Sequence, residues 1–206
     1  MIIRKGLEGT NKIRLRRKDA DGLTEPLLAD IEDAVGRFDF TYHAQRRGAG
    51  GSKIADARLL RHLNPELQRG RACSAGRHSM PLRVFHTTDF PEGEGITIAL
   101  SSPRWRWNER QATQHGQVLA WPGDILLARV GRNLEKKVGF LVDGPVAISD
   151  CVFRLRVPAT EREALIRHLT SHNGRSVLHS IASGTGARYL SKTELLKIHL
   201  PYKTRD

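Results

Sequence analysis

The sequence predicts an α+β protein with a twisted, mostly antiparallel β core and C-terminal helices packed on it. Short apolar segments separated by turn-forming residues dominate residues 82–157, a pattern typical of strands. From residue 160 onward the apolar residues change to helical spacing. The 206 residues suffice for one medium domain with an appendage. We therefore expect one main domain, residues 53–206, preceded by a smaller segment, residues 1–52.

For residues 1–52 the sequence predicts a basic arm, a short helix and a linker. Residues 1–23 are charged and poor in large apolar side chains, which favours a loose arm or a short strand. A helix is expected from Thr24 as N-cap to Phe38, with Pro26 in its first turn. Its apolar face consists of Leu27, Leu28, Ile31, Val35 and Phe38. The stretch QRRGAGGSK, residues 45–53, has the composition of a flexible linker.

The main domain is expected to begin with one or two helical turns that end near Pro65. Strands are then expected over 82–87 and 96–101 and in the segments QVLAW, DILLARV, VGFLVD and VAISDCVFRLRV. Asp143 and Gly144 predict a hairpin turn into the last of these strands. Alternation within that strand predicts that Arg154 and Arg156 face water.

Three helices are expected in the final third of the chain. The first would run from about residue 161 to 172 and stop near Gly174, and the second would follow it. Capping boxes begin at Thr160 and Ser191, where a hydroxyl residue is followed three positions later by Glu. A short helix is therefore expected after Ser191, and the chain would then end in the extended segment IHLPY.

The charge of the chain predicts a polyanionic partner. It has 34 Lys and Arg against 22 Asp and Glu, a net charge of +12. Residues 1–52 hold 10 basic and 8 acidic residues, so residues 53–206 hold 34 − 10 = 24 and 22 − 8 = 14, and the excess belongs to the main domain. Of the basic residues 25 are Arg, which suits bidentate contacts with phosphate or guanine and equally fits a GC-rich genome.

Cysteine usage and hydropathy predict a cytoplasmic protein with no membrane association. The two cysteines, Cys73 and Cys151, are far apart and form no paired motif. No apolar run approaches the roughly 20 residues of a membrane helix, and the N-terminus lacks the apolar core of a signal peptide.

Catalytic patterns are weak throughout the sequence. Asp124, Glu135 and Lys137 imitate an acid followed by Glu-x-Lys, which holds a divalent metal near a scissile phosphate in some nucleases. The spacing of this motif is loosely constrained, so chance matches are common. His168 and His172 lie four residues apart, but two helix-surface histidines explain this spacing better than a metal site. We predict no cofactor, no metal and no catalysis by this chain alone, with a magnesium-dependent nuclease as an alternative.

Basic loops are the better-supported feature. Arg and Asn are the side chains that contact guanine and adenine edges in a bidentate manner, whereas Lys more naturally meets phosphates. Alternating Arg and Trp over residues 104–107 predict a strand with buried indoles and exposed guanidinium groups. The residues predicted to contact DNA are Arg71, Arg77, Arg129, Arg132, Asn133, Lys136, Lys137, Thr185, Arg188, Tyr189 and Lys192. The loop 129–137 is the main candidate, with the loop 184–192 as its companion, and a general RNA-binding protein is a further alternative.

The order of these segments resembles the target recognition domain of type I restriction-modification specificity subunits. The resemblance is carried by GDILLARVG at 123–131, KVGFL at 137–141 and AISDCVFRLR at 147–156. The segment LIRHLTSHNGRSVLHSIASGTGARYLSKTELLKIHLPY is similar to the closing helices, Gly-rich loop and final strand of that family. The segment LQRGRACSAGRHSMPLRVFHTTDF matches the opening strand and Arg-Gly loop less closely, and the likeness spans about residues 53–202.

This resemblance implies a non-catalytic DNA sequence-recognition module. Its partners would be double-stranded DNA, an adenine DNA methyltransferase subunit and, in restriction systems, a motor subunit, in the context of DNA methylation and phage defence. Full specificity subunits carry two recognition domains joined by long helices, whereas this sequence has one domain and no long helix after Pro201. The chain would then be a half-subunit that forms a homodimer, a free-standing recognition protein, or part of a fused adenine methyltransferase.

Overall fold

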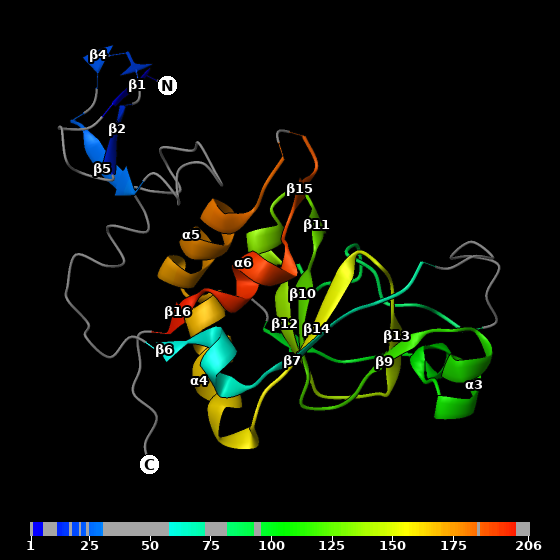
Figure 1. The fold of residues 1–206 in the computed structure, drawn as a ribbon. Helices are drawn as coiled ribbons and strands as arrows, with labels where there is room; N and C mark the ends of the chain where they lie inside the picture. Colours follow the sequence, from blue (N-terminus) through cyan, green and yellow to red (C-terminus); the bar gives the residue numbers. More distant parts are fainter. Residues whose placement is uncertain are drawn as a thin grey trace. The chain divides into compact units, whose positions relative to one another are not determined.

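The chain forms two compact units, residues 1–55 and residues 56–206 (Figure 1). The computed structural model describes residues 2–5, 12–16, 18–20, 22–23, 25–30, 58–72, 82–92, 96–184 and 186–200. No helix among these residues is long and apolar enough to cross a membrane.

The first unit is a small antiparallel sheet. Strands β1 (Ile2–Lys5), β2 (Lys12–Arg16) and β5 (Leu27–Asp30) lie in the order β1-β2-β5, and β3 (Lys18–Asp19) pairs with β4 (Gly22–Leu23). Successive side chains of β2 point to opposite faces of the sheet, so that Ile13 and Leu15 are buried while Arg14 is exposed. Leu15 lies opposite Leu27 in the register, so these two leucines share the buried face.

The helix predicted from Thr24 to Phe38 is wrong over its described part. Residues 27–30 form β5, with Leu27 buried and Leu28 37% exposed. A helix would turn both leucines toward one face, whereas pairing with β2 sends them to opposite faces of the sheet. The remainder of that helix and the predicted linker 45–53 lie outside the described residues.

A five-stranded sheet forms the centre of the second unit, in the order β7-β14-β10-β12-β8. The strands are β7 (Glu66–Arg69), β14 (Val152–Arg156), β10 (Ile125–Ala128), β12 (Val138–Leu141) and β8 (Thr97–Ile98). All pairs are antiparallel except β12 with β8. Each β10 side chain is fully buried, as expected of an apolar run in a central strand. The predicted α+β class with a mostly antiparallel core is confirmed.

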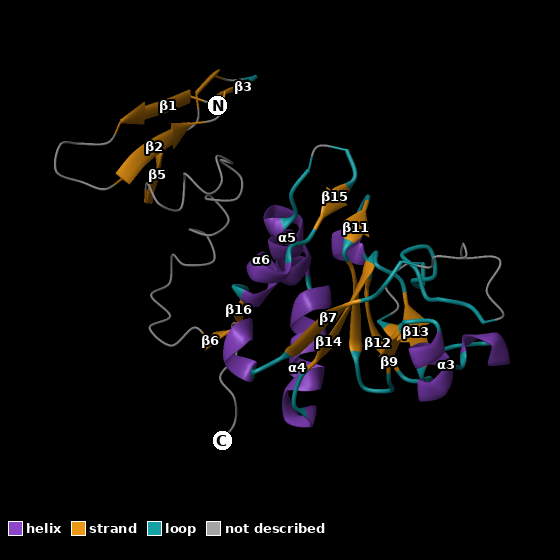
Figure 2. Cartoon of the chain, turned by 45° about the vertical axis from the view of Figure 1, so that its right-hand side comes forward, coloured by secondary structure: helices purple, strands orange, loops and turns teal. Residues whose placement is uncertain are grey.

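Helices cover one side of this sheet, and a second β layer lies on the other side (Figure 2). The helices are α4 (Ala159–Thr170), α5 (His172–Ile181) and α6 (Lys192–Leu196), whose Leu165, Leu169, Leu178 and Leu195 are fully buried. Ser191 caps α6 as predicted, because its hydroxyl accepts a hydrogen bond from the Glu194 amide at 3.1 Å. Thr160 does not cap α4. The helix starts two residues earlier than predicted, at Ala159 with Pro158 as its N-cap, so the Thr160 backbone is already helical.

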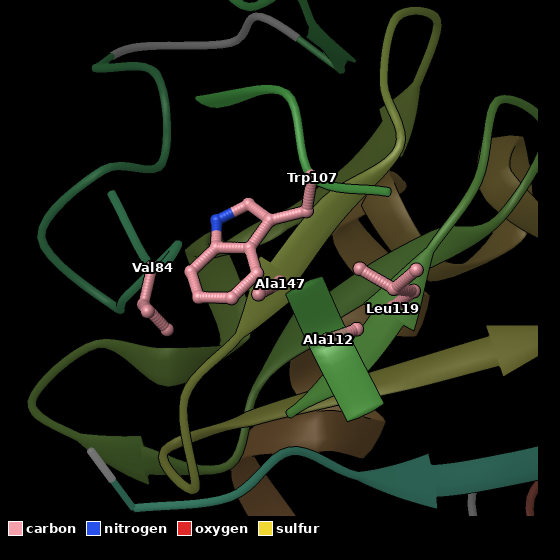
Figure 3. Close-up of a cluster of buried hydrophobic side chains, with 5 residues drawn as sticks. All are labelled: Val84, Trp107, Ala112, Leu119 and Ala147. Atoms are coloured by element: carbon pink, nitrogen blue, oxygen red, sulfur yellow. The ribbon is translucent and has the colours of Figure 1, made fainter. Parts of the chain in front are cut away.

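The second layer encloses a small core of its own. Strands β9 (Val118–Ala120) and β13 (Val146–Ile148) pair beside α3 (Glu109–Gln114). Trp107 packs there with Val84, Ala112, Leu119 and Ala147 (Figure 3). The two tryptophans of 104–107 are buried and the arginines exposed, as predicted. The predicted strand there is wrong, because Pro103 opens the 3₁₀ turn η2 (Pro103–Trp105).

The predicted Asp143-Gly144 hairpin is also wrong. After Pro145 the chain enters β13, which pairs with β9, and only after a turn at 149–151 does it form β14. Proline has no amide to donate, which is consistent with a break in the ladder at this point. Of the predicted strand 82–87, only Phe85 forms a β-bridge, with Ile148. The helical turn near Pro65 is confirmed as η1 (Leu60–Leu63), and the final strand as β16 (His199–Leu200), which pairs with β6 (Arg58–Leu59).

Candidate nucleic-acid interface

A two-stranded ribbon joins the two loops that the sequence analysis singled out. Strand β11 (Val130–Gly131) pairs antiparallel with β15 (Arg188–Tyr189), and the Leu190 amide donates to the Arg129 carbonyl at 2.8 Å. Both views show this ribbon at one end of the second unit (Figures 1 and 2). We call residues 129–137 and 186–192 the basic ribbon. The two loops are therefore neighbours in space, and their shared role in contacting DNA stays a prediction.

The tip of the ribbon is held by one buried side chain. The 3₁₀ turn η3 (Leu134–Lys136) places Leu134 in the core at 1% exposure. Asn133, which precedes the turn, has the left-handed conformation (φ 53°), which Asn tolerates better than most residues. Arg132, Asn133 and Lys136 are consequently exposed around the anchored leucine.

The ribbon is strongly positive. Residues 129–137 include four basic residues and one acidic residue, and residues 186–192 include two basic residues and no acidic one. The side chains of Arg132, Lys136 and Lys192 are exposed and form no hydrogen bond or ion pair with the described part of the chain. Tyr189 is 46% exposed beside them. These side chains are therefore available to an external polyanion.

Three other predicted contact residues are held by the protein itself. The Arg129 Nε donates to the Asp150 carbonyl at 2.7 Å, and the Lys137 Nζ donates to the Thr87 carbonyl at 2.9 Å. The Arg188 guanidinium donates to the carbonyls of His179 (2.5 Å) and Ala182 (2.9 Å). Burial and the neighbouring Arg69 charge lower the pKa of Arg129. These bonds hold Arg129, Lys137 and Arg188 to the protein, whereas Arg132, Lys136 and Lys192 stay free in the part of the chain that the structure describes.

The remaining predicted residues divide between described and undescribed parts of the chain. Arg71 is exposed just beyond β7, at the end of the sheet where β10 leads into the ribbon. Arg77 and Thr185 lie outside the described residues.

Arg69 is a cation of this surface that the sequence analysis missed. Its Nε and Nη2 donate to the Asp150 carbonyl and carboxylate, each at 3.2 Å, and its side chain is 52% exposed. Gly70 brings the end of β7 against the turn, because a Cβ at this position would lie 2.2 Å from the carbonyl oxygens of Ile148 and Ser149. The available signal was the Arg-Gly-Arg sequence at the end of a short strand.

The predicted nuclease residues do not converge. Asp124 is 1% exposed, and its carboxylate accepts from Arg156 Nε at 2.7 Å, Arg156 Nη2 at 2.9 Å and the Trp121 amide at 2.8 Å. It precedes β10, whereas Glu135 and Lys137 follow that strand and lie at its opposite end. In the described ranges no three His, Cys, Asp or Glu residues are grouped so that they could hold a metal ion.

The predicted exposure of the β14 arginines needs correction. Arg154 is 6% exposed, donates to the Leu119 carbonyl at 2.6 Å and pairs with Glu66. Arg156 is partly buried and also reaches Glu66, at 3.3 Å. The helices cover one face of β14 and the β9–β13 layer covers the other. Buried and solvent-exposed side chains therefore do not alternate along this strand.

Comparison with known proteins finds similarity at the level of structure. No protein-family model and no curated protein matches the chain. The S subunit of a type I restriction-modification system from M. genitalium matches with 12% identity over 70% of this chain and 33% of that one, at a TM-score of 0.38. A chain from work on complex assembly and conformational transition in the type I restriction-modification system matches with 15% identity over 82% and 43%, at a TM-score of 0.47. This chain thus spans less than half the length of either protein. Both TM-scores are below 0.5, so the function proposed below rests on residues of this chain.

Proposed function

We propose that residues 56–206 form a DNA-binding specificity module that directs an adenine DNA methyltransferase, or a restriction-modification complex, to its target. The observation that carries this proposal is the basic ribbon. Two segments far apart in the sequence meet there through β11 and β15, and they present unpaired cations beside a polar Asn and an exposed Tyr.

The chemistry of the ribbon suits duplex DNA. A two-stranded β-ribbon fits the major groove, where Arg contacts guanine and Asn contacts adenine through paired hydrogen bonds. Arg132 and Asn133 supply these two side chains next to each other at the tip. Lys136 and Lys192 supply charge suited to phosphates, which position a protein on DNA without selecting a sequence.

Binding without catalysis is the simplest function for this surface. A nuclease would need the Asp124 carboxylate to coordinate a metal ion. This carboxylate is buried and accepts hydrogen bonds from Arg156 and a backbone amide. We therefore place enzymatic activity in a partner. The methyltransferase partner is inferred from the sequence resemblance, and co-purification with an adenine methyltransferase encoded nearby is the direct test of it.

DNA titration of the full chain tests the proposal. Labelled duplex is titrated across salt concentrations, with and without magnesium, using wild type and the double variant Arg132→Ala/Lys136→Ala. We expect the variant to bind about 10- to 100-fold more weakly and to reduce the slope of log affinity against log salt by about 0.9, since Lys136 is the phosphate contact that it loses.

The matched control removes two exposed arginines elsewhere, Arg104→Ala/Arg110→Ala, on η2 and α3. An equal loss in this control would show that net charge, not the ribbon, drives binding. Magnesium-dependent cleavage that Glu135→Ala abolishes would favour the nuclease alternative. Equal affinity for RNA and for every duplex selected from a random library would overturn sequence recognition.

A further inference from the structure

The Arg69–Asp150 pair lies beside the basic ribbon and differs from the other ion pairs of the sheet. Arg69 ends β7, and Asp150 lies in the turn between β13 and β14. The two side chains meet at 3.2 Å while 52% and 33% exposed. Exposed pairs of this kind contribute at most about 1 kcal/mol to stability, so a competing anion can displace the carboxylate at little cost.

The backbone holds the Arg69 guanidinium in place independently of that carboxylate. Its Nε donates to the Asp150 carbonyl, which also accepts from Arg129 Nε. Gly70 keeps the end of β7 against the same turn. If the carboxylate is displaced, Arg69 therefore remains oriented by its Nε and presents its Nη2 to solvent. A planar guanidinium fixed in this way is suited to bind a phosphate.

Residue 129 connects this pair to the ribbon. The Arg129 amide donates to the Cys151 carbonyl at 2.8 Å, and the Arg129 side chain donates to the Asp150 carbonyl. The Arg129 carbonyl in turn accepts from the amide of Leu190 in the ribbon. Arg69 and Arg71 therefore extend the positive surface from the base of the ribbon, at Arg129, onto the end of β7. Among the described residues of this end, Asp150 is the acidic side chain in direct contact with an arginine of that surface.

We propose that Arg69 binds a backbone phosphate of duplex DNA and that Asp150 is an internal competitor, which holds Arg69 in the absence of DNA and weakens binding to arbitrary sequence. This inference rests on the proposed function, because it assigns a further phosphate site to the same DNA-binding surface. The carboxylate occupies the place of the phosphate and is exchanged for it when DNA docks.

A double-mutant cycle on the full chain tests the exchange. Asp150→Asn removes the competing charge and retains the side-chain shape and the backbone carbonyl that orients Arg69. We expect duplex DNA to bind about 3- to 10-fold more tightly at low salt, with a salt slope steeper by up to about 0.9, as one more cation becomes available. Arg69→Ala should weaken binding, and Asp150→Asn should then have no effect in the Arg69→Ala background.

The chain offers a closely matched control in the Arg106–Asp143 pair. These side chains meet at 2.9 Å with exposures of 54% and 29%, and Arg106 also donates to a backbone carbonyl, that of Gly144. Asp143 follows β12, at the end of the sheet away from the ribbon. Asp143→Asn changes net charge by the same amount as Asp150→Asn, and we expect it to leave both affinity and salt slope nearly unchanged.

The outcomes separate this inference from the proposed function. An equal gain from Asp143→Asn, or a gain from Asp150→Asn that persists without Arg69, would reduce the effect to net charge and overturn the inference alone. Normal binding by Arg69→Ala, together with weak binding by the ribbon double variant, would also overturn it while leaving the proposed function intact. No duplex binding by wild type would overturn both. Urea unfolding of each variant verifies that the fold is retained.

Discussion

The two ends of the five-stranded sheet carry the same residue types in opposite arrangements. At the paired end, where β10 begins, Arg156 reaches both Asp124 and Glu66, and Arg154 reaches Glu66. At the basic end, where β10 leads into the ribbon, Arg69 and Arg129 share Asp150, and Arg132 has no described partner. Charge is thus satisfied internally at one end and left available at the other.

Burial explains why these two arrangements have different consequences. Asp124 is almost completely buried and fully hydrogen-bonded, so its charge cannot be used by a ligand and its loss would leave Arg156 without its main partner. Asp150 is partly exposed, so water screens its charge and a ligand can replace it. The comparison indicates that the paired end stabilises the fold and that the basic end is free to bind.

The largest expected effect comes from Asp124→Ala. Removal of Asp124 leaves the Arg156 guanidinium, which is 36% exposed, with Glu66 as its remaining acidic partner. We therefore place the cost at about 3 kcal/mol, the low end of the range for a broken buried pair. We expect a loss of this size in the free energy of unfolding, measured by urea denaturation. A loss below about 1 kcal/mol would mean that the paired end is not a stabilising element.

Gly70→Ala is expected to have the next largest effect, now at the basic end. The new Cβ would lie 2.2 Å from two carbonyl oxygens, which are backbone atoms and cannot simply rotate away. We expect about 1–3 kcal/mol of destabilisation, as for other overpacked sites, together with weaker DNA binding because Arg69 and Arg71 shift. Gly186→Ala is the control, since a Cβ there meets nothing within 4 Å. Unchanged stability and binding for Gly70→Ala would contradict the close packing of this turn.

The reactivity of Cys151 gives a smaller, site-specific measure of the basic end. Burial and the adjacent Asp150 carboxylate raise the pKa of the Cys151 thiol. Asp150→Asn should lower that pKa toward its ordinary value and increase the thiolate fraction at a given pH. We expect iodoacetamide to alkylate Cys151 several-fold faster at about pH 8 in a Cys73→Ser background. Equal rates in Asp143→Asn and wild type would show that the effect is local, and slower alkylation of Asp150→Asn would contradict the geometry.

The smallest expected effect is that of Asp150→Asn on stability. Because the Arg69–Asp150 pair is exposed, we expect the free energy of unfolding to change by less than about 1 kcal/mol. The difference between this loss in the free energy of unfolding and that of Asp124→Ala measures how much more the paired end contributes to stability than the basic end. Comparable losses for the two substitutions would remove the distinction between them.

Local patterns were sufficient for much of this fold. The apolar run of β10, the helical spacing after residue 160 and the Ser191 cap each depend on neighbouring residues, and each is confirmed. The failures involve partners distant in the chain. The burial of Arg154 depends on Glu66, on a strand far earlier in the sequence, and β5 forms because Leu27 meets Leu15 across a sheet.

In the candidate site, too, features set by neighbouring residues could be predicted and features set by distant residues could not. The exposed cations of the ribbon could be predicted, because Gly, Asn and a run of basic residues indicate a loop. The companion loop 184–192 could be predicted as well. That Arg129 and Arg188 are held by carbonyl groups, and that Arg69 belongs to the surface, could not be predicted, because both depend on turns brought together by the sheet.

The pairing of β11 with β15 forms the frame of the ribbon, whereas the exposed side chains at its tip supply the groups that would contact a ligand. The ribbon is joined by main-chain hydrogen bonds and anchored by the buried Leu134, so its frame does not depend on the exposed side chains at its tip. Substitutions at positions 132, 136 and 187 would therefore alter the chemical groups offered to a ligand while leaving the scaffold unchanged. Such a surface can acquire new preferences in few mutational steps, and it is a natural place to randomise residues when a new target is sought.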